Sequence, residues 1–134
     1  MTTHDYDTAY FDFHMQLLAT FIKHVKEQPP FCLETCHQDD QDFLHELTEL
    51  PNSGGSVLLI QGQQLFCRIV AAYPHCMPLV PRDLLWFFGG DCLHYMPDEE
   101  IHIFQQLDEM RQNAKESNQP FAYESARMSL MGLH

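Results

Sequence analysis

Proline and glycine clusters divide this chain of 134 residues into segments whose lengths suit helices. Between the clusters, apolar side chains recur every three or four residues, which is the period of an amphipathic helix. The clusters lie at residues 29–30, 51–55, 74–81, 89–90 and 97. They predict helices over residues 8–28, 39–50, 56–73, 82–88 and 97–113. Because the connections are short, we expect an all-α fold, a compact bundle of five or six helices with mostly antiparallel neighbours.

Segment 56–73 can be interpreted in two ways, because Val57-Leu58-Leu59-Ile60 could also be a strand that enters a hairpin. A helix gathers most of the apolar side chains, Leu59 among them, within about 140° of arc, and a hairpin would break that register. Gly62 lies in the middle of this stripe, where glycine costs about 1 kcal/mol relative to alanine. We therefore expect a helix, and a close crossing of another helix at Gly62.

The two ends of the chain are weakly patterned. We expect residues 1–134 to form a single helical domain, since chains of this length usually do. Residues 1–7 are polar and acidic, without the basic and apolar regions of an export signal, and are expected to be a loose N-terminus. Residues 115–134 would form either one more helix that packs back or a peptide that orders on a partner.

Charge restricts the classes of partner. The chain has 7 lysines and arginines against 19 acidic residues, a formal net charge of −12. This balance argues against direct nucleic-acid binding and against an anionic membrane surface. No apolar run approaches the roughly 20 residues of a membrane span. Five cysteines, an odd number without an export signal, predict reduced thiols in a cytoplasmic protein.

Two short motifs, Asp42-x-x-His45 and Glu99-x-x-His102, have the spacing of di-iron ligands in helical bundles. Such ligands must project into the bundle. Both motifs instead lie opposite the apolar stripe of their helix, and we expect them on solvated faces.

Cysteine and histidine also gather in the predicted loops. Thiolates and imidazoles are ligands that zinc prefers, and a structural zinc site usually needs four of them. The candidates are Cys32, Cys36, His37, His75, Cys76, Cys92 and His94. None of their spacings matches a zinc-finger pattern, and thiols also pack as small apolar groups. We expect no cofactor, with zinc as the alternative.

Cys92 with His94 is the best candidate for a catalytic nucleophile, because a thiol needs a nearby base to ionise. The acidic surroundings act in the opposite direction and raise the pKa of a thiol. No serine-hydrolase elbow, phosphate-binding loop, dinucleotide fingerprint or zinc-protease motif is present. The sequence therefore favours a protein without catalysis.

His14 is unusual because it lies in the apolar stripe of the first predicted helix. A charged imidazole is costly there, so we expect a neutral core histidine with one hydrogen-bond partner. The alternative is a ligand to metal or haem, or a general base, in a pocket inside the bundle. Tyr73, Trp86 and Tyr95 would line such a pocket with His14.

Residues 82–96 are dense in large apolar side chains. A short helix that is apolar on all sides must be buried on all sides, which is difficult in a small domain without a second subunit. Aromatic residues and methionine are also enriched at interface centres. The predicted interface residues are Leu84, Leu85, Trp86, Phe87, Phe88 and Met96.

These features favour a small acidic, cytoplasmic, helical protein that acts as a protein-interaction or regulatory module. We expect a homodimer whose further partner has a basic protein surface. The alternatives are a metal- or haem-binding helical protein and a small-molecule-binding bundle pocket around His14.

Overall fold

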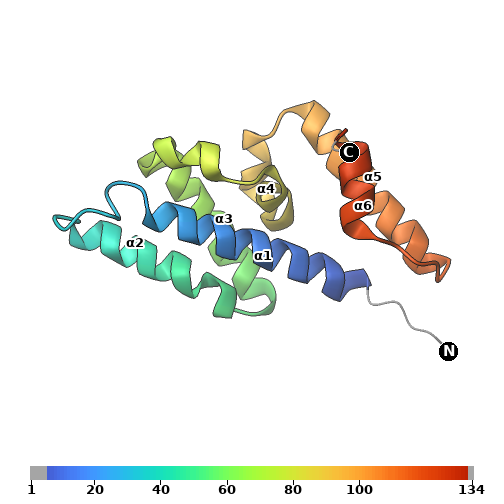
Figure 1. Ribbon diagram of the computed structural model, residues 1–134, viewed down its shortest axis with the longest axis horizontal. Helices are drawn as coiled ribbons and strands as arrows, with labels where there is room; N and C mark the ends of the chain where they lie inside the picture. The colour runs from blue at the N-terminus through green and yellow to red at the C-terminus, as the bar shows by residue number, and fades with distance from the viewer. Residues whose placement is uncertain (1–5, 133–134) are drawn as a thin grey trace. The chain divides into compact units, whose positions relative to one another are not determined.

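A computed structural model describes residues 6–132 (Figure 1). Within this range the chain forms six α-helices and three short 3-10 helices, without any strand. The elements are α1 (Tyr6–Lys26), α2 (Gln38–Glu49), η1 (Leu50–Asn52), α3 (Gly55–Ala72), η2 (Pro74–Leu79), α4 (Arg82–Phe88), η3 (Gly90–Tyr95), α5 (Asp98–Glu116) and α6 (Tyr123–Leu130). The all-α prediction is confirmed. The bundle of five or six helices with mostly antiparallel neighbours stays a prediction, as does the single domain.

Proline and glycine set the helix boundaries as expected. Helices α4 and α5 follow Pro81 and Pro97 directly, and Gly89 ends α4 with a φ of 67°, which favours glycine. Of the N-terminus predicted to be loose, residues 1–5 lie outside the described residues, and Tyr6 and Asp7 begin α1. No helix within residues 6–132 combines the length and the apolar character that a membrane span requires.

The contacts within the chain divide it into two compact units. Unit 1 comprises the described residues 6–13 and 96–132, and unit 2 is His14–Tyr95. The division falls inside α1, so that the first two turns of this helix belong to unit 1 and the remainder to unit 2.

Aromatic rings pack together in the core of unit 2. Phe66 of α3 is fully buried, and its ring lies 5.4 Å from that of Phe21 and 5.2 Å from that of Phe88 between ring centroids. Gly62, one turn before Phe66, permits this packing, because a Cβ atom there would lie 2.2 Å from the Phe88 ring. The predicted helix crossing at Gly62 is therefore confirmed, and α4 is the crossing helix. Gln63 donates a hydrogen bond of 2.8 Å to the Phe88 carbonyl.

The chain reverses its direction at η1, between α2 and α3 (Figure 1). Near the turn, the Ser53 hydroxyl donates to the Gln61 side-chain carbonyl at 3.1 Å. At the far end, an Arg68 guanidinium nitrogen lies 3.4 Å from the Asp39 carbonyl oxygen. The first contact holds the turn against the beginning of α3, and the second joins α3 to the first turn of α2.

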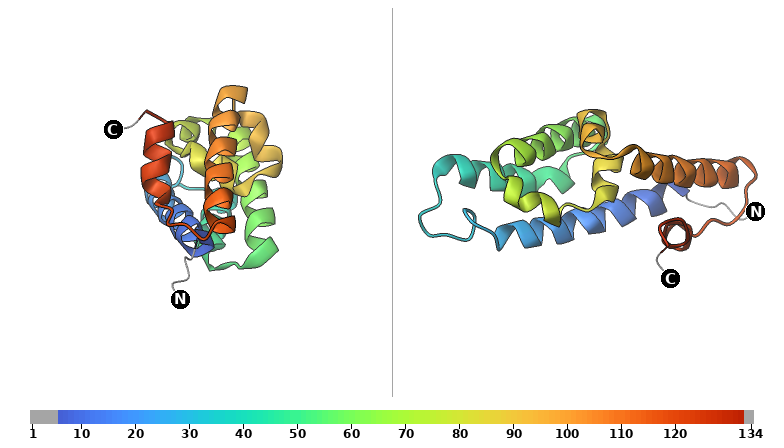
Figure 2. Two further views of the ribbon diagram at one scale, coloured as in Figure 1. Left: turned by 90° about the vertical axis from the view of Figure 1, so that its right-hand side faces the viewer. Right: turned by 90° about the horizontal axis from the view of Figure 1, so that it is seen from above.

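Unit 1 is held by polar and aromatic contacts, and α6 packs against α5 within it (Figure 2). Of the two alternatives for residues 115–134, the described part of this segment forms a further helix, α6. The Tyr6 hydroxyl lies within hydrogen-bond distance of the Ala114 and Gln119 carbonyls. The Tyr123 ring contacts those of Tyr10 and Phe13, at 5.3 and 5.2 Å between centroids.

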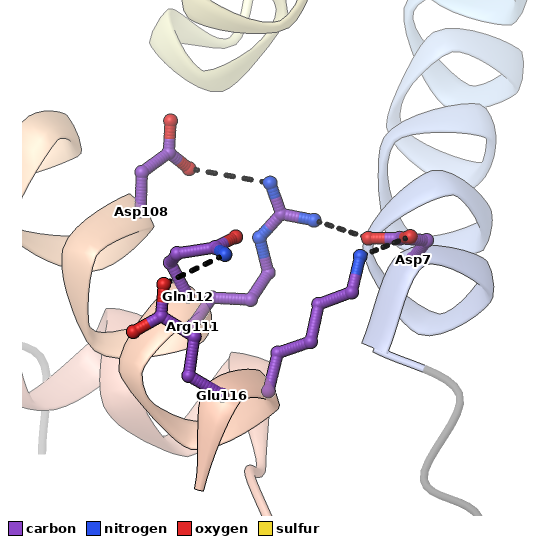
Figure 3. Close-up of polar contacts among 6 residues, drawn as sticks. Asp7, Asp108, Arg111, Gln112 and Glu116 are labelled. Carbon is purple, nitrogen blue, oxygen red and sulfur yellow. Dashed lines mark hydrogen bonds and ion pairs between the residues drawn. The ribbon is translucent and has the colours of Figure 1, made fainter. Parts of the chain in front are cut away.

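Arg111 is the centre of a charge network in unit 1 (Figure 3). Its guanidinium carbon lies 3.9 Å from the centre of the Tyr10 ring. Guanidinium nitrogens lie 3.2 Å from a carboxylate oxygen of Asp7 and 3.8 Å from a carboxylate oxygen of Asp108. Lys115 pairs with the second oxygen of Asp7 at 3.0 Å. The network therefore joins α5 to the first turn of α1, and its charges remain partly exposed.

Candidate functional site

The predicted zinc ligands lie in different environments. Cys76 and Cys92 are buried, Cys36 is half-buried, and Cys32, His37, His75 and His94 are exposed. His75 makes a hydrogen bond of 2.6 Å to the Pro29 carbonyl, and His94 lies 3.9 Å from Asp91. Among residues 6–132, no group of three or more histidine, cysteine or acidic side chains is arranged to hold a metal ion.

Cys92 and His94 diverge although they are two residues apart. Cys92 is fully buried, whereas the side chain of His94 is 79% exposed. Burial, together with the nearby Cys67 thiol, raises the pKa of Cys92 to about 12. The thiol is therefore protonated at neutral pH and is no nucleophile.

Contacts are defined for three of the four predicted pocket residues, His14, Tyr73 and Tyr95. The His14 ring is fully buried and stacks on Phe87, with centroids 4.8 Å apart. Tyr73 instead contacts the rings of Phe31 and Phe43, and the Tyr95 carbonyl accepts a hydrogen bond of 2.7 Å from Arg82. Neither of the two cavities described below is lined by His14, Tyr73, Trp86 or Tyr95.

Most of the predicted interface residues lie inside the fold. Four of them are buried: Leu84, Leu85, Phe88 and Met96. Trp86 and Phe87 keep partial exposure. The close crossing of α4 over Gly62 explains the burial of Phe88, because the absence of a side chain at Gly62 leaves room for the Phe88 ring. An interface at α4 would therefore be formed through Trp86 and Phe87.

The two acid–histidine motifs lie on exposed faces, as expected: Asp42, His45, Glu99 and His102 are all exposed. His45 nevertheless has a notable position, because it borders both cavities described in unit 2. The first cavity, of about 360 Å³, lies between α2 and the loop before it. It is lined by Phe31, Leu33, Glu34, Cys36, Gln41, Leu44, His45 and Thr48.

The second cavity, of about 370 Å³, lies between α2, η1 and α3. We call it the α2–α3 cleft, lined by His45, Glu46, Glu49, Ser53, Gln61, Gln64 and Leu65. Two carboxylates and two side-chain amides give it a strongly polar wall, and Leu65 supplies an apolar contribution. Glu49 accepts a hydrogen bond of 3.0 Å from Asn52, which holds its carboxylate near η1. The cleft can therefore accept hydrogen bonds and carries negative charge.

The sequence pattern did not predict this cleft, although two aliphatic residues on the solvated face of α3 could have indicated it. Val57 and Ile60 are 51% and 54% exposed and stand outside the buried stripe of α3. At 100° per residue, Val57 lies between Gln61 and Gln64, and Ile60 lies about 40° beyond Gln64 on the same side of the helix. Aliphatic residues on the solvated face of a helix are the signal that could have indicated this surface.

These features define an all-helical, acidic protein with a negatively charged cleft between two helices. The chain belongs to the PA2817-like family, whose model matches residues 6–133. No curated protein and no solved structure matches the chain. The family description names no activity. The function is therefore inferred from the acidic surface and the α2–α3 cleft.

Proposed function

We propose that this protein is a non-catalytic, cytoplasmic interaction module that forms a homodimer and binds a further protein through a basic surface of that partner. The proposal needs no cofactor. The helical bundle expected from the sequence serves as a scaffold that presents acidic side chains at fixed positions.

The observation that carries the proposal is the unequal placement of the two charge signs. All seven lysines and arginines lie within the described residues, and five of them make internal contacts. These five are Arg68, Arg82, Arg111, Lys115 and Arg127. Measured by exposure, four of the seven cations are exposed, against fourteen of the eighteen acidic residues in the same range. The surface is therefore more uniformly negative than composition alone indicates, which favours and accelerates association with a basic protein.

Native mass spectrometry of untagged protein, at two ionic strengths, tests the proposal. Alone, we expect the mass of a dimer without bound metal or organic molecule. With an arginine-rich model peptide, we expect a complex at low ionic strength that dissociates at high ionic strength, because salt screens exposed charges. An acidic peptide of the same length serves as control. A bound metal or organic mass, or no complex with any basic peptide, would contradict the proposal.

A further inference from the structure

We propose that the α2–α3 cleft is the docking site for a basic amphipathic helix of the partner protein. This inference rests on the proposed function and specifies its site and the chemistry of its partner. The partner helix would place an arginine or lysine in the cleft and aliphatic side chains on Val57 and Ile60.

The lining of the cleft suits a cationic group. Glu46 and Glu49 are one turn apart on α2, so both carboxylates border the same cavity. Opposite them, Gln61 and Gln64 of α3 offer side-chain amide oxygens as further acceptors. A guanidinium with five donors matches such a wall, since arginine pairs with carboxylates through two parallel hydrogen bonds.

The nearest arginine of the α2–α3 hairpin is already engaged elsewhere. Arg68 lies over the Phe43 ring, 5.1 Å from its centre, and reaches the Asp39 carbonyl at the far end of α2. Arg68 therefore lies at the end of the hairpin that is far from η1. Glu49 lies at the opposite end, next to η1. A partner's cation would find the two glutamates available at the other end.

Charge complementarity extends beyond the cleft along α2. Asp39, Asp42, Glu46 and Glu49 are all exposed, and their spacing places them within about 80° of arc on one helix face. A partner with basic residues at three- and four-residue spacing would meet this row of carboxylates in register. Such spacing is the property of a basic amphipathic helix.

Val57 and Ile60 supply the apolar part of the site. Each residue is about half exposed on the first turns of α3. Val57 lies between the cleft residues Gln61 and Gln64 on the helix surface, and Ile60 lies about 40° beyond Gln64. Burying these two side chains under the aliphatic face of a partner adds an attraction that salt does not screen. An amphipathic helix offers both chemistries, and it would lie with its charged side over α2 and its apolar side over α3.

Fluorescence anisotropy with a defined probe tests the site. The probe is a labelled synthetic helix of about 20 residues, with arginine on one face and leucine on the other, and a scrambled peptide of equal charge is its control. The full chain is used throughout. We expect the double variant E46Q/E49Q to weaken binding about tenfold and I60Q about fivefold. Raising the salt concentration should abolish the first effect and preserve the second.

Matched variants in unit 1 separate a specific site from general charge. E109Q/E124Q removes the same two charges from exposed positions of α5 and α6, and M128Q replaces an exposed apolar side chain of α6. Each should change binding by less than about twofold. All substitutions are at exposed positions, and circular dichroism confirms that the variants fold.

The outcomes distinguish the site from the function. Equal losses in E46Q/E49Q and E109Q/E124Q would overturn the site while leaving a general basic partner in place. Absence of any binding to wild-type protein would overturn both the site and the proposed function. Loss of the homodimer in I60Q would assign this face to a second copy of the chain and would also overturn the inference.

Discussion

Both compact units pack aromatic rings, but they differ in the exposed ion pairs that accompany this packing. Unit 2 buries stacked rings around Phe66 and brings Gly62 into direct contact with Phe88. Unit 1 joins its helices through the Arg111 network, whose charges remain in contact with solvent. Dispersion and apolar burial are insensitive to salt, whereas exposed ion pairs are screened. We therefore expect the stability of unit 1 to depend more strongly on ionic strength than that of unit 2.

The largest effect is expected at the core of unit 2. Phe66→Ala removes a fully buried ring and should lower the free energy of unfolding by about 3–5 kcal/mol. Urea denaturation measures this loss. Ile60→Ala, at an exposed position on the same helix, is the control and should cost about 0.5 kcal/mol or less. Similar losses in both variants would show that the buried rings do not stabilise unit 2.

A smaller loss is expected at Gly62. In Gly62→Ala the new methyl would lie 2.2 Å from the Phe88 ring, so α4 must shift. Overpacking of this kind costs about 1–3 kcal/mol, although alanine itself favours a helix. Gly54→Ala adds its methyl in open space and should change stability by less than about 1 kcal/mol. A stabilising effect of Gly62→Ala in thermal denaturation would contradict the close crossing.

In unit 1, Arg111→Ala should cost about 1–2 kcal/mol, because it removes a cation–π contact and a pair of partly exposed ion pairs. Hydrogen exchange in α5 and α6 measures the effect locally. Arg111→Lys should restore part of the loss, since lysine lacks the planar guanidinium. The cost should shrink at high salt. If the stability lost in Arg111→Ala does not depend on salt, the exposed ion pairs do not distinguish unit 1 from unit 2.

The smallest effect concerns a polar contact of unit 2. The Tyr73 hydroxyl donates a hydrogen bond of 2.5 Å to Asp40, and burial followed by this carboxylate raises the pKa of Tyr73 from 10.0 to about 12. Tyr73→Phe should cost about 1 kcal/mol at neutral pH.

The same contact gives a defined pH dependence. Between pH 10.0 and about 12 the unfolded chain loses the tyrosine proton while the folded chain keeps it, so stability falls as the pH rises. Denaturation at increasing pH should show a shallower decline in Tyr73→Phe than in wild type. Identical declines would exclude Tyr73 as the source.

Sequence patterns predicted the helices of both units to within a few residues, because proline and glycine act locally. The first helix was expected over 8–28 and spans Tyr6–Lys26. Residues 91–95, which lie between the predicted helices 82–88 and 97–113, form most of the 3-10 helix η3. The helical period of the apolar residues predicted which side chains are buried less accurately than it predicted the helices. Leu59, assigned to the apolar stripe of α3, is 38% exposed, because the neighbouring helices cover a narrower arc than the stripe.

The candidate site could not be predicted in the same way. Glu46 and Glu49 have the sequence signature of any solvated helix face, and only the chain reversal at η1 places them opposite Gln61 and Gln64. Conversely, η2 and η3 each bury one cysteine that suggested zinc and leave the neighbouring histidine exposed. Tertiary contacts of this kind are not fixed by any spacing along the chain.

Hydrogen–deuterium exchange of the full chain, with and without the basic amphipathic peptide, tests the central claim most directly. We predict slower exchange in α2 and the first half of α3 when the peptide is bound at low salt, with α5 and α6 unchanged. Protection centred on α5 and α6, or spread evenly over the acidic surface, would contradict the claim that the α2–α3 cleft binds the partner.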